Sequence, residues 1–152
     1  LNTFNYIIKN VNKNFKIHYV KSNTKVFDWK IPKQWEIKNA YIKLPNGQKI
    51  CQLNENNLHI VNYSKPVKKR LSFSELKKNL YFITKKPNAI PYVTSYYKKN
   101  WGFCISYNQF KKLPKKGIYE VLIDSKIFNG KMGYMDLLIP GKSKKEILIT
   151  SY

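Results

Sequence analysis

The sequence contains a single arginine, few acidic residues and many lysines. Arg70 is the only arginine among 29 basic residues, and 8 acidic residues leave a formal net charge of +21. Guanidinium forks are the groups that proteins favour for phosphates and guanine edges. The lysines are spread from Lys9 to Lys145 instead of being grouped on one helix. The charge therefore predicts no specific nucleic-acid partner.

Cysteine and histidine are also scarce, which restricts the metal and redox chemistry of this chain. The two cysteines, Cys51 and Cys104, are far apart in sequence, and neither belongs to a close Cys or His pair. A zinc knuckle or a redox motif is thus not supported, and we expect two buried free thiols. His18 falls on the polar face of a predicted strand, where we expect a solvated side chain. No Ser-His-Asp or Cys-His arrangement and no Gly-rich phosphate loop is present.

Long apolar runs are missing as well. No stretch approaches the roughly 20 residues of a membrane span, and the start lacks the charged-then-apolar order of a signal peptide. We therefore predict a cytoplasmic protein with no membrane partner. Leu1 is not an initiator Met, and Tyr152 directly follows the apolar run 147–149, so we expect both ends to be cut from a longer polypeptide.

The remaining composition is that of a folded chain. Hydrophobic residues make up 43% and aromatic residues 15% of the 152 residues, which is enough to build a core despite the charge. The length allows one domain or two small ones.

Periodicity predicts the first elements. Apolar residues at i, i+3, i+4 and i+7 from Phe4 predict a helix over residues 3–13, and alternation predicts a strand over residues 15–20. Residues 26–35 fit neither period. The Asn46-Gly47 step predicts a tight hairpin between strands 40–44 and 48–53.

The rest of the chain shows further strands and one short helix. Residues 58–63 read as a strand, and Ser72 with Glu75 forms a capping box for a helix through about Leu80. Short strands or extended segments are predicted at residues 92–97 and 101–106. Three strands follow at 119–124, 134–139 and 146–152. The last is nearly continuous in apolar residues, as in a strand that an α/β sheet covers on both faces.

Several stretches resemble one protein family. They are Val26-Phe27-Asp28-Trp29, Ile31-Pro32-Lys33-Gln34-Trp35, Asn57-Leu58-His59, Tyr63-Ser64-Lys65-Pro66, residues 90–97, Trp101-Gly102-Phe103-Cys104, Ile123-Asp124-Ser125 and Pro140-Gly141. Together they resemble a bacterial aminopeptidase-like family of unknown function, often met among surface-polysaccharide genes, in which a di-zinc aminopeptidase fold carries an inserted β-rich domain.

The resemblance covers nearly the whole chain and implies its organisation. The implied fold class is α+β or α/β: a partial aminopeptidase-like α/β domain that carries an inserted, mainly β domain. Residues 1–25 start the aminopeptidase-like domain, residues 26–116 form the inserted domain, and residues 117–152 continue the first domain. The sequence departs from the family pattern in two places: Tyr107 stands where the family tends to have His, and Met135-Asp136 replaces a Gly-Glu pair. We therefore do not assume that this chain keeps the family's pocket unchanged.

The resemblance also implies which chemistry is missing from residues 1–152. In the family, the strand corresponding to residues 146–152 is followed by a Cys-His-Pro segment and an Asn-Asp/Glu stretch that supply zinc ligands and acid-base groups. An Arg-Ser motif upstream of the first helix is missing too. We therefore expect no cofactor, metal ligand or catalytic residue in this chain, and zinc in the complete protein. The implied substrate is a small peptide or aminoacyl compound, and assembly into a homo-oligomer is left open.

Four residues are candidates for substrate contact: His59, Tyr96, Tyr97 and Trp101. With Tyr92, the last three predict an aromatic wall for stacking on a sugar or a peptide side chain. The alternative is that these rings form the small core of the inserted domain, which we prefer because aromatic side chains bury large areas. For His59 the alternative is a hydrogen-bonded structural histidine, which we also prefer.

Three functions follow as hypotheses. The first is a fragment of a zinc-dependent aminopeptidase-like hydrolase that is inactive alone. The second is a basic binding module for nucleic acid or acidic polysaccharide. In the third, the inserted domain covers the catalytic cleft or mediates assembly of the complete protein.

Overall fold

The computed structural model describes residues 2–96, 98–143 and 145–151 and divides into two compact units. The central unit is Lys33–Phe128, and the terminal unit combines Leu1–Pro32 with Asn129–Tyr152. The inserted domain implied by the family resemblance was predicted to run from residue 26 to residue 116. The central unit continues to Phe128 because the strand that begins at Tyr119 pairs with two other strands of that unit.

Within its described residues, the terminal unit contains one helix and two antiparallel strand pairs. Helix α1 spans Asn2–Asn10, and β1 (Lys16–Lys21) pairs with β10 (Lys131–Asp136). A Cβ atom added at Gly133 of β10 would lie 2.7 Å from the Phe4 ring of α1, so the helix packs closely on this strand. The predicted helix and strand are confirmed, although the helix ends three residues earlier than expected.

Two features of the terminal unit differ from the sequence prediction. A small hairpin joins β2 (Lys25–Val26) to β3 (Trp29–Lys30), in a stretch too short to show a period. The strand predicted for residues 146–152 is wrong over residues 146–151, where Ile147, Leu148 and Ile149 are exposed. A strand needs a hydrogen-bonded neighbour, and none of residues 2–96, 98–143 or 145–151 provides one for it. Tyr152 lies outside the described residues.

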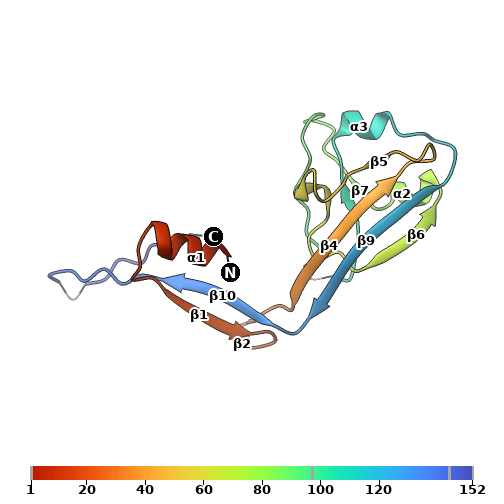
Figure 1. Cartoon of the computed structure of the whole chain (residues 1–152). Helices are drawn as coiled ribbons and strands as arrows, with labels where there is room; N and C mark the ends of the chain where they lie inside the picture. The colour runs from red at the N-terminus through yellow and green to blue at the C-terminus, as the bar shows by residue number, and fades with distance from the viewer. Residues whose placement is uncertain (1, 97, 144, 152) are drawn as a thin grey trace. The chain divides into compact units, whose positions relative to one another are not determined.

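A four-stranded antiparallel sheet forms the central unit, in the order β5-β4-β9-β6. Its strands are β4 (Gln34–Lys43), β5 (Lys49–Ile50), β6 (Val67–Leu71) and β9 (Tyr119–Phe128). Figure 1 shows β4, β9 and β6 running side by side. Strands β4 and β9 pair from Gln34↔Phe128 to Lys43↔Glu120, with one irregularity between Ile37 and Asn39.

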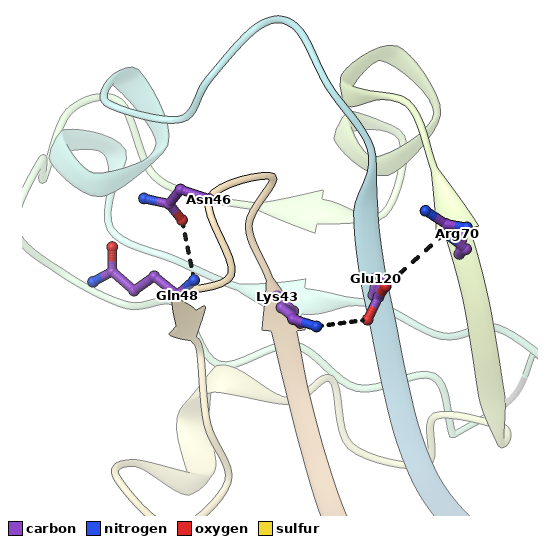
Figure 2. Close-up of polar contacts among 5 residues, drawn as sticks. All are labelled: Lys43, Asn46, Gln48, Arg70 and Glu120. Carbon is purple, nitrogen blue, oxygen red and sulfur yellow. Dashed lines mark hydrogen bonds and ion pairs between the residues drawn. The ribbon is translucent and has the colours of Figure 1, made fainter.

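The hairpin predicted at Pro45-Asn46-Gly47 is confirmed. Gly47 has φ +90°, which favours glycine, and Asn46 Oδ1 accepts a hydrogen bond from the backbone N–H of Gln48 at 3.0 Å (Figure 2). Beside this turn, Glu120 of β9 lies between Lys43 of β4 and Arg70 of β6. The N···O distances are 3.3 Å and 4.0 Å, so the outer face of the sheet is charged and open to water (Figure 2).

The opposite face of the sheet carries the core. Its buried sheet residues are Ala40, Ile42, Val67, Tyr119, Val121 and Ile123. The covering layer contains α2 (Phe73–Lys77), β7 (Leu80–Tyr81), β8 (Phe103–Cys104) and α3 (Tyr107–Lys111). The capping box is confirmed, because Ser72 Oγ accepts the Glu75 N–H and Glu75 reaches back to the Ser72 N–H. Helix α3, capped by Ser106, was not predicted.

The strand predicted at residues 58–63 is wrong. Residues Asn57–His59 form the short 3-10 helix η1, after which Ile60 and Asn62 make isolated bridges to Phe103 and Thr94. Asn56 caps η1 through its side chain, which accepts the Leu58 N–H at 2.9 Å and draws the chain into a turn. The architecture is therefore mixed, with several sheets and few helices, and the inserted character of the β-rich unit stays a prediction. Within the described ranges, every helix falls short of the length and apolarity that a bilayer crossing requires.

Candidate functional site

The chain between η1 and β6 is held by backbone hydrogen bonds on two sides. Asn62 donates to Val93 O at 2.9 Å and accepts from the Ser95 N–H at 2.8 Å. On the other side Val61 donates to Gly102 O at 3.1 Å. Residues 60–65, 93–95 and 100–103 therefore lie together, although they are up to about 40 positions apart. Most of the motifs that carry the family resemblance in this unit meet here.

Ser64 is the centre of this arrangement and is fully buried. Its hydroxyl donates to Val61 O at 2.6 Å and accepts the Gly102 N–H at 3.3 Å. Its carbonyl accepts hydrogen bonds from Trp35 Nε1 at 2.9 Å and from Ser125 Oγ at 2.7 Å. Ser64 thus links strands β4 and β9 to the segment at residues 60–65 and to the segment at residues 100–103.

A row of aromatic rings runs along this region from Trp35 to Tyr96. The ring centroids of Trp35 and Tyr63 are 6.0 Å apart in a stacked pair, and those of Tyr63 and Tyr96 are 5.0 Å apart, edge to face. Tyr63 has φ +61°, an uncommon conformation for a bulky residue, and its hydroxyl donates to Lys33 O at 3.2 Å. Burial, and then the nearby Tyr92 hydroxyl, raise the pKa of Tyr63. The phenol therefore stays protonated at neutral pH.

Tyr96 borders a shallow hollow of about 270 Å³. Its lining residues are Val61, Tyr81, Val93, Thr94, Ser95, Tyr96, Lys98 and Asn100. Asn100 Nδ2 donates to the Tyr81 hydroxyl at 3.0 Å, which fixes both polar groups at the rim. Phenol rings, amide, hydroxyl and ammonium groups together suit a ligand with both apolar faces and polar atoms, such as a peptide or a sugar. A second hollow, of about 340 Å³, lies at Asn39, Lys68, Leu122 and Asp124 on the outer face of the sheet and contains none of the predicted site residues.

Comparison with known proteins identifies the central unit. Residues 34–126 match the family model described as "Domain of unknown function (DUF2172)". The chain belongs to this family. The matched range nearly coincides with the compact unit Lys33–Phe128, so the DUF2172 domain is a structural unit in its own right.

The sequence similarity to known proteins extends beyond the DUF2172 domain to most of the chain. The chain is 47% identical over 137 residues to a Clostridium acetobutylicum protein named "Putative polysaccharide biosynthesis protein with aminopeptidase-like domain". A crystal structure described as a "putative peptidase" from Clostridium acetobutylicum has 46% identity and a TM-score of 0.82 over 88% of this chain. The chain spans 31% of the length of each. The resemblance to the aminopeptidase-like family is thereby confirmed.

Three of the four predicted substrate residues lie within the described residues, and they occupy different environments in the DUF2172 domain. Trp101 is 7% exposed and belongs to the hydrophobic core, as the packing alternative predicted. His59 is 6% exposed, and its Nδ1 lies 2.8 Å from Cys104 O, as expected of a structural histidine. Tyr96 lines the hollow, and Tyr97 lies outside the described residues.

Sequence reasoning missed Tyr81 and Asn100, which complete the rim of the hollow. The available signal was Gly102, where an added Cβ would lie 2.6 Å from Tyr81 Cε2 and 2.8 Å from Asn79 O. A glycine that follows a buried tryptophan indicates such a close approach. Without the pairing of β7 with β8, however, the partner of that approach could not be named.

The residues that the structure describes do not fit a zinc site. No three His, Cys, Asp or Glu side chains within residues 2–96, 98–143 and 145–151 gather as a ligand set. His18 belongs to the terminal unit, where it stacks on Tyr134 at 4.9 Å and bonds Asp136. Burial raises the pKa of the Cys51 thiol to about 12 and that of Cys104 to about 11, so both free thiols stay protonated and are poor metal ligands.

Proposed function

We propose that this chain is the N-terminal part of a cytoplasmic, zinc-dependent aminopeptidase-like hydrolase that acts on a small peptide or aminoacyl substrate. In this proposal the metal ligands belong to the part of the polypeptide beyond these residues, and this chain is inactive alone. The observation that supports it is the 47% identity, over 90% of the chain, to a protein named for an aminopeptidase-like domain.

The DUF2172 domain has a supporting role in this proposal. Its hollow at Tyr96 contacts the part of the substrate that does not react, and Ser64 holds the surrounding loops in place. Remote contacts of this kind position a substrate for reaction. Tyr96 supports this role because it combines an aromatic face with polar neighbours on a hydrogen-bonded framework.

Metal analysis tests the hydrolase proposal. The complete polypeptide and this 152-residue chain would be purified in the same way and measured for zinc by mass spectrometry. We expect bound zinc in the complete protein and a substoichiometric amount in the isolated chain. Tight, stoichiometric zinc in the isolated chain would overturn the assignment of the ligands.

Steady-state kinetics of the complete protein test the role of Tyr96. We expect Tyr96→Ala to raise KM roughly tenfold with a smaller change in kcat, because the lost contact is made in the ground state and the transition state alike. Tyr6→Ala is the matched control, since Tyr6 is an exposed tyrosine of the terminal unit that does not line the hollow. Equal effects of the two variants would contradict a substrate contact and favour a domain that only covers the cleft or mediates assembly.

A further inference from the structure

The covering layer of the DUF2172 domain carries an unusual concentration of lysine. Residues 73–88 and 107–117 contain eight lysines in four adjacent pairs, and Glu75 is their only acidic residue. The pairs are Lys77-Lys78, Lys85-Lys86, Lys111-Lys112 and Lys115-Lys116, all with exposed side chains. We call these two segments the lysine-rich layer.

Aromatic packing holds the two segments of the lysine-rich layer together. The ring of Phe110 lies 4.2 Å from that of Phe82 and 6.0 Å from that of Phe73, measured between centroids. Asn108 adds two polar links, donating its backbone N–H to Pro87 O at 3.0 Å and its side-chain amide to Asn88 at 2.7 Å. Lysine pairs that look dispersed along the sequence are therefore brought onto one part of the fold.

The positive charge of this layer is largely uncompensated. The ion pairs found in the described parts of the chain involve His18, Lys43, Arg70 and Lys126, and none of the eight lysines. Glu75 has Lys78 and Lys69 in its vicinity, but it is a single negative charge. Clustered charges of one sign produce a field that attracts polymers of the opposite sign.

Local structure accounts for only part of the lysine content. Lys77 and Lys111 lie in the last turns of α2 and α3, where cations complement the helix dipole. Lys115 lies 4.0 Å from the centroid of the Phe73 ring, a cation–π contact. Neither effect explains Lys85, Lys86 or Lys116, so folding alone does not account for the clustering.

We propose that the lysine-rich layer binds an acidic polysaccharide, a polymer that carries one carboxylate per sugar or per few sugars. Lysine presents a single mobile ammonium group, a point charge that suits the spaced carboxylates of a flexible polymer, and it lacks the planar fork that reads guanine edges. The layer contains no arginine. Its rings pack against one another, with Phe73, Phe82 and Tyr107 all gathered around Phe110, instead of forming an open platform for stacking bases. The proposal does not depend on the hydrolase function.

Binding of the 152-residue chain to polygalacturonate, measured by calorimetry at several salt concentrations, tests this proposal. The test variant is Lys85→Gln/Lys86→Gln/Lys112→Gln/Lys116→Gln. It removes both lysines of the pair 85–86 and one lysine each from the pairs 111–112 and 115–116. The matched control is Lys9→Gln/Lys13→Gln/Lys142→Gln/Lys145→Gln, which removes the same charge from exposed positions of the terminal unit. Circular dichroism of both variants confirms that they are folded.

The expected result is a specific loss of affinity. The test variant should bind polygalacturonate about tenfold or more weakly and show a shallower salt dependence, while the control loses no more than about threefold. Equal losses in both variants would overturn the proposal, because net charge alone would then explain the binding. Tighter binding to oligo(dT) or to vesicles with 30% phosphatidylserine would overturn it in favour of a nucleic acid or a membrane, and neutral dextran should not bind.

Discussion

At the residue scale, the most informative position of the DUF2172 domain is Ser64. Its hydroxyl and carbonyl make four hydrogen bonds, to Trp35, Val61, Gly102 and Ser125. Three of these partners are between 29 and 61 positions away, so no local pattern could have identified the role of this serine. Asn46 and Gly47 were predictable because their roles depend only on the turn that they form.

Replacing Ser64 tests this role. Ser64→Ala removes the hydroxyl and leaves the Gly102 N–H buried without its acceptor, so we expect the free energy of unfolding to fall by about 1–3 kcal/mol. Thr84→Ala at an exposed position should change it by less than about 0.5 kcal/mol. Urea titration followed by tryptophan fluorescence measures both. A loss no larger for Ser64→Ala than for Thr84→Ala would show that the hydroxyl does not hold the loops.

At the element scale, prediction succeeded where local chemistry decides the structure. The capping box of α2, the hairpin at Gly47 and the alternation of β1 are all local signals. The strand predicted at 58–63 was wrong, and so was the one predicted at 146–152 over its described residues 146–151, because an apolar run also suits a buried turn or an unpaired segment. Strand pairing is a long-range property, and a short apolar run does not encode its partner.

The capping box of α2 gives a prediction about pH. Hydrogen bonds from the backbone N–H and the hydroxyl of Ser72 lower the pKa of Glu75 below its ordinary value of 4.5. A carboxylate with a lowered pKa adds stability above its unfolded pKa, and this stability disappears as the pH falls through its folded pKa. Wild type should therefore be more stable than Glu75→Gln at pH 6, with a difference that shrinks from about pH 4.5 downward.

Urea unfolding at pH 6, 4.5 and 3 measures this difference. In the Ser72→Ala background the dependence should be weaker, because one of the two donors to Glu75 is gone. A difference between wild type and Glu75→Gln that is constant from pH 6 to pH 3 would show that the charge of Glu75 does not stabilise the helix.

At the scale of the whole molecule, the chain consists of a complete small core and a smaller terminal unit. Every buried residue of the core cluster lies between Ala40 and Ile123, within Lys33–Phe128. The family model covers the same residues. The family resemblance predicted an inserted β-rich domain over residues 26–116, and that stays a prediction. The C-terminal end of the compact unit depends on the long-range pairing of β9 with β4 and β6, which no local pattern reveals.

The self-contained core predicts that residues 33–128 fold alone. We expect this excised unit to give one cooperative urea transition and a near-UV circular dichroism spectrum from its buried Trp101 and Tyr119. A gradual loss of signal without a transition would show that the terminal unit is required for folding.

The account depends most on the claim that catalysis needs donor groups from outside this chain. Hydrolysis by a metal-activated water requires a set of His, Asp and Glu ligands, and residues 2–96, 98–143 and 145–151 do not assemble one. The most direct test is the release of p-nitroaniline from aminoacyl p-nitroanilides by the purified 152-residue chain, with added zinc and with a chelator. We predict no release above the buffer rate under either condition, and zinc-dependent turnover that the chelator abolishes would contradict the account.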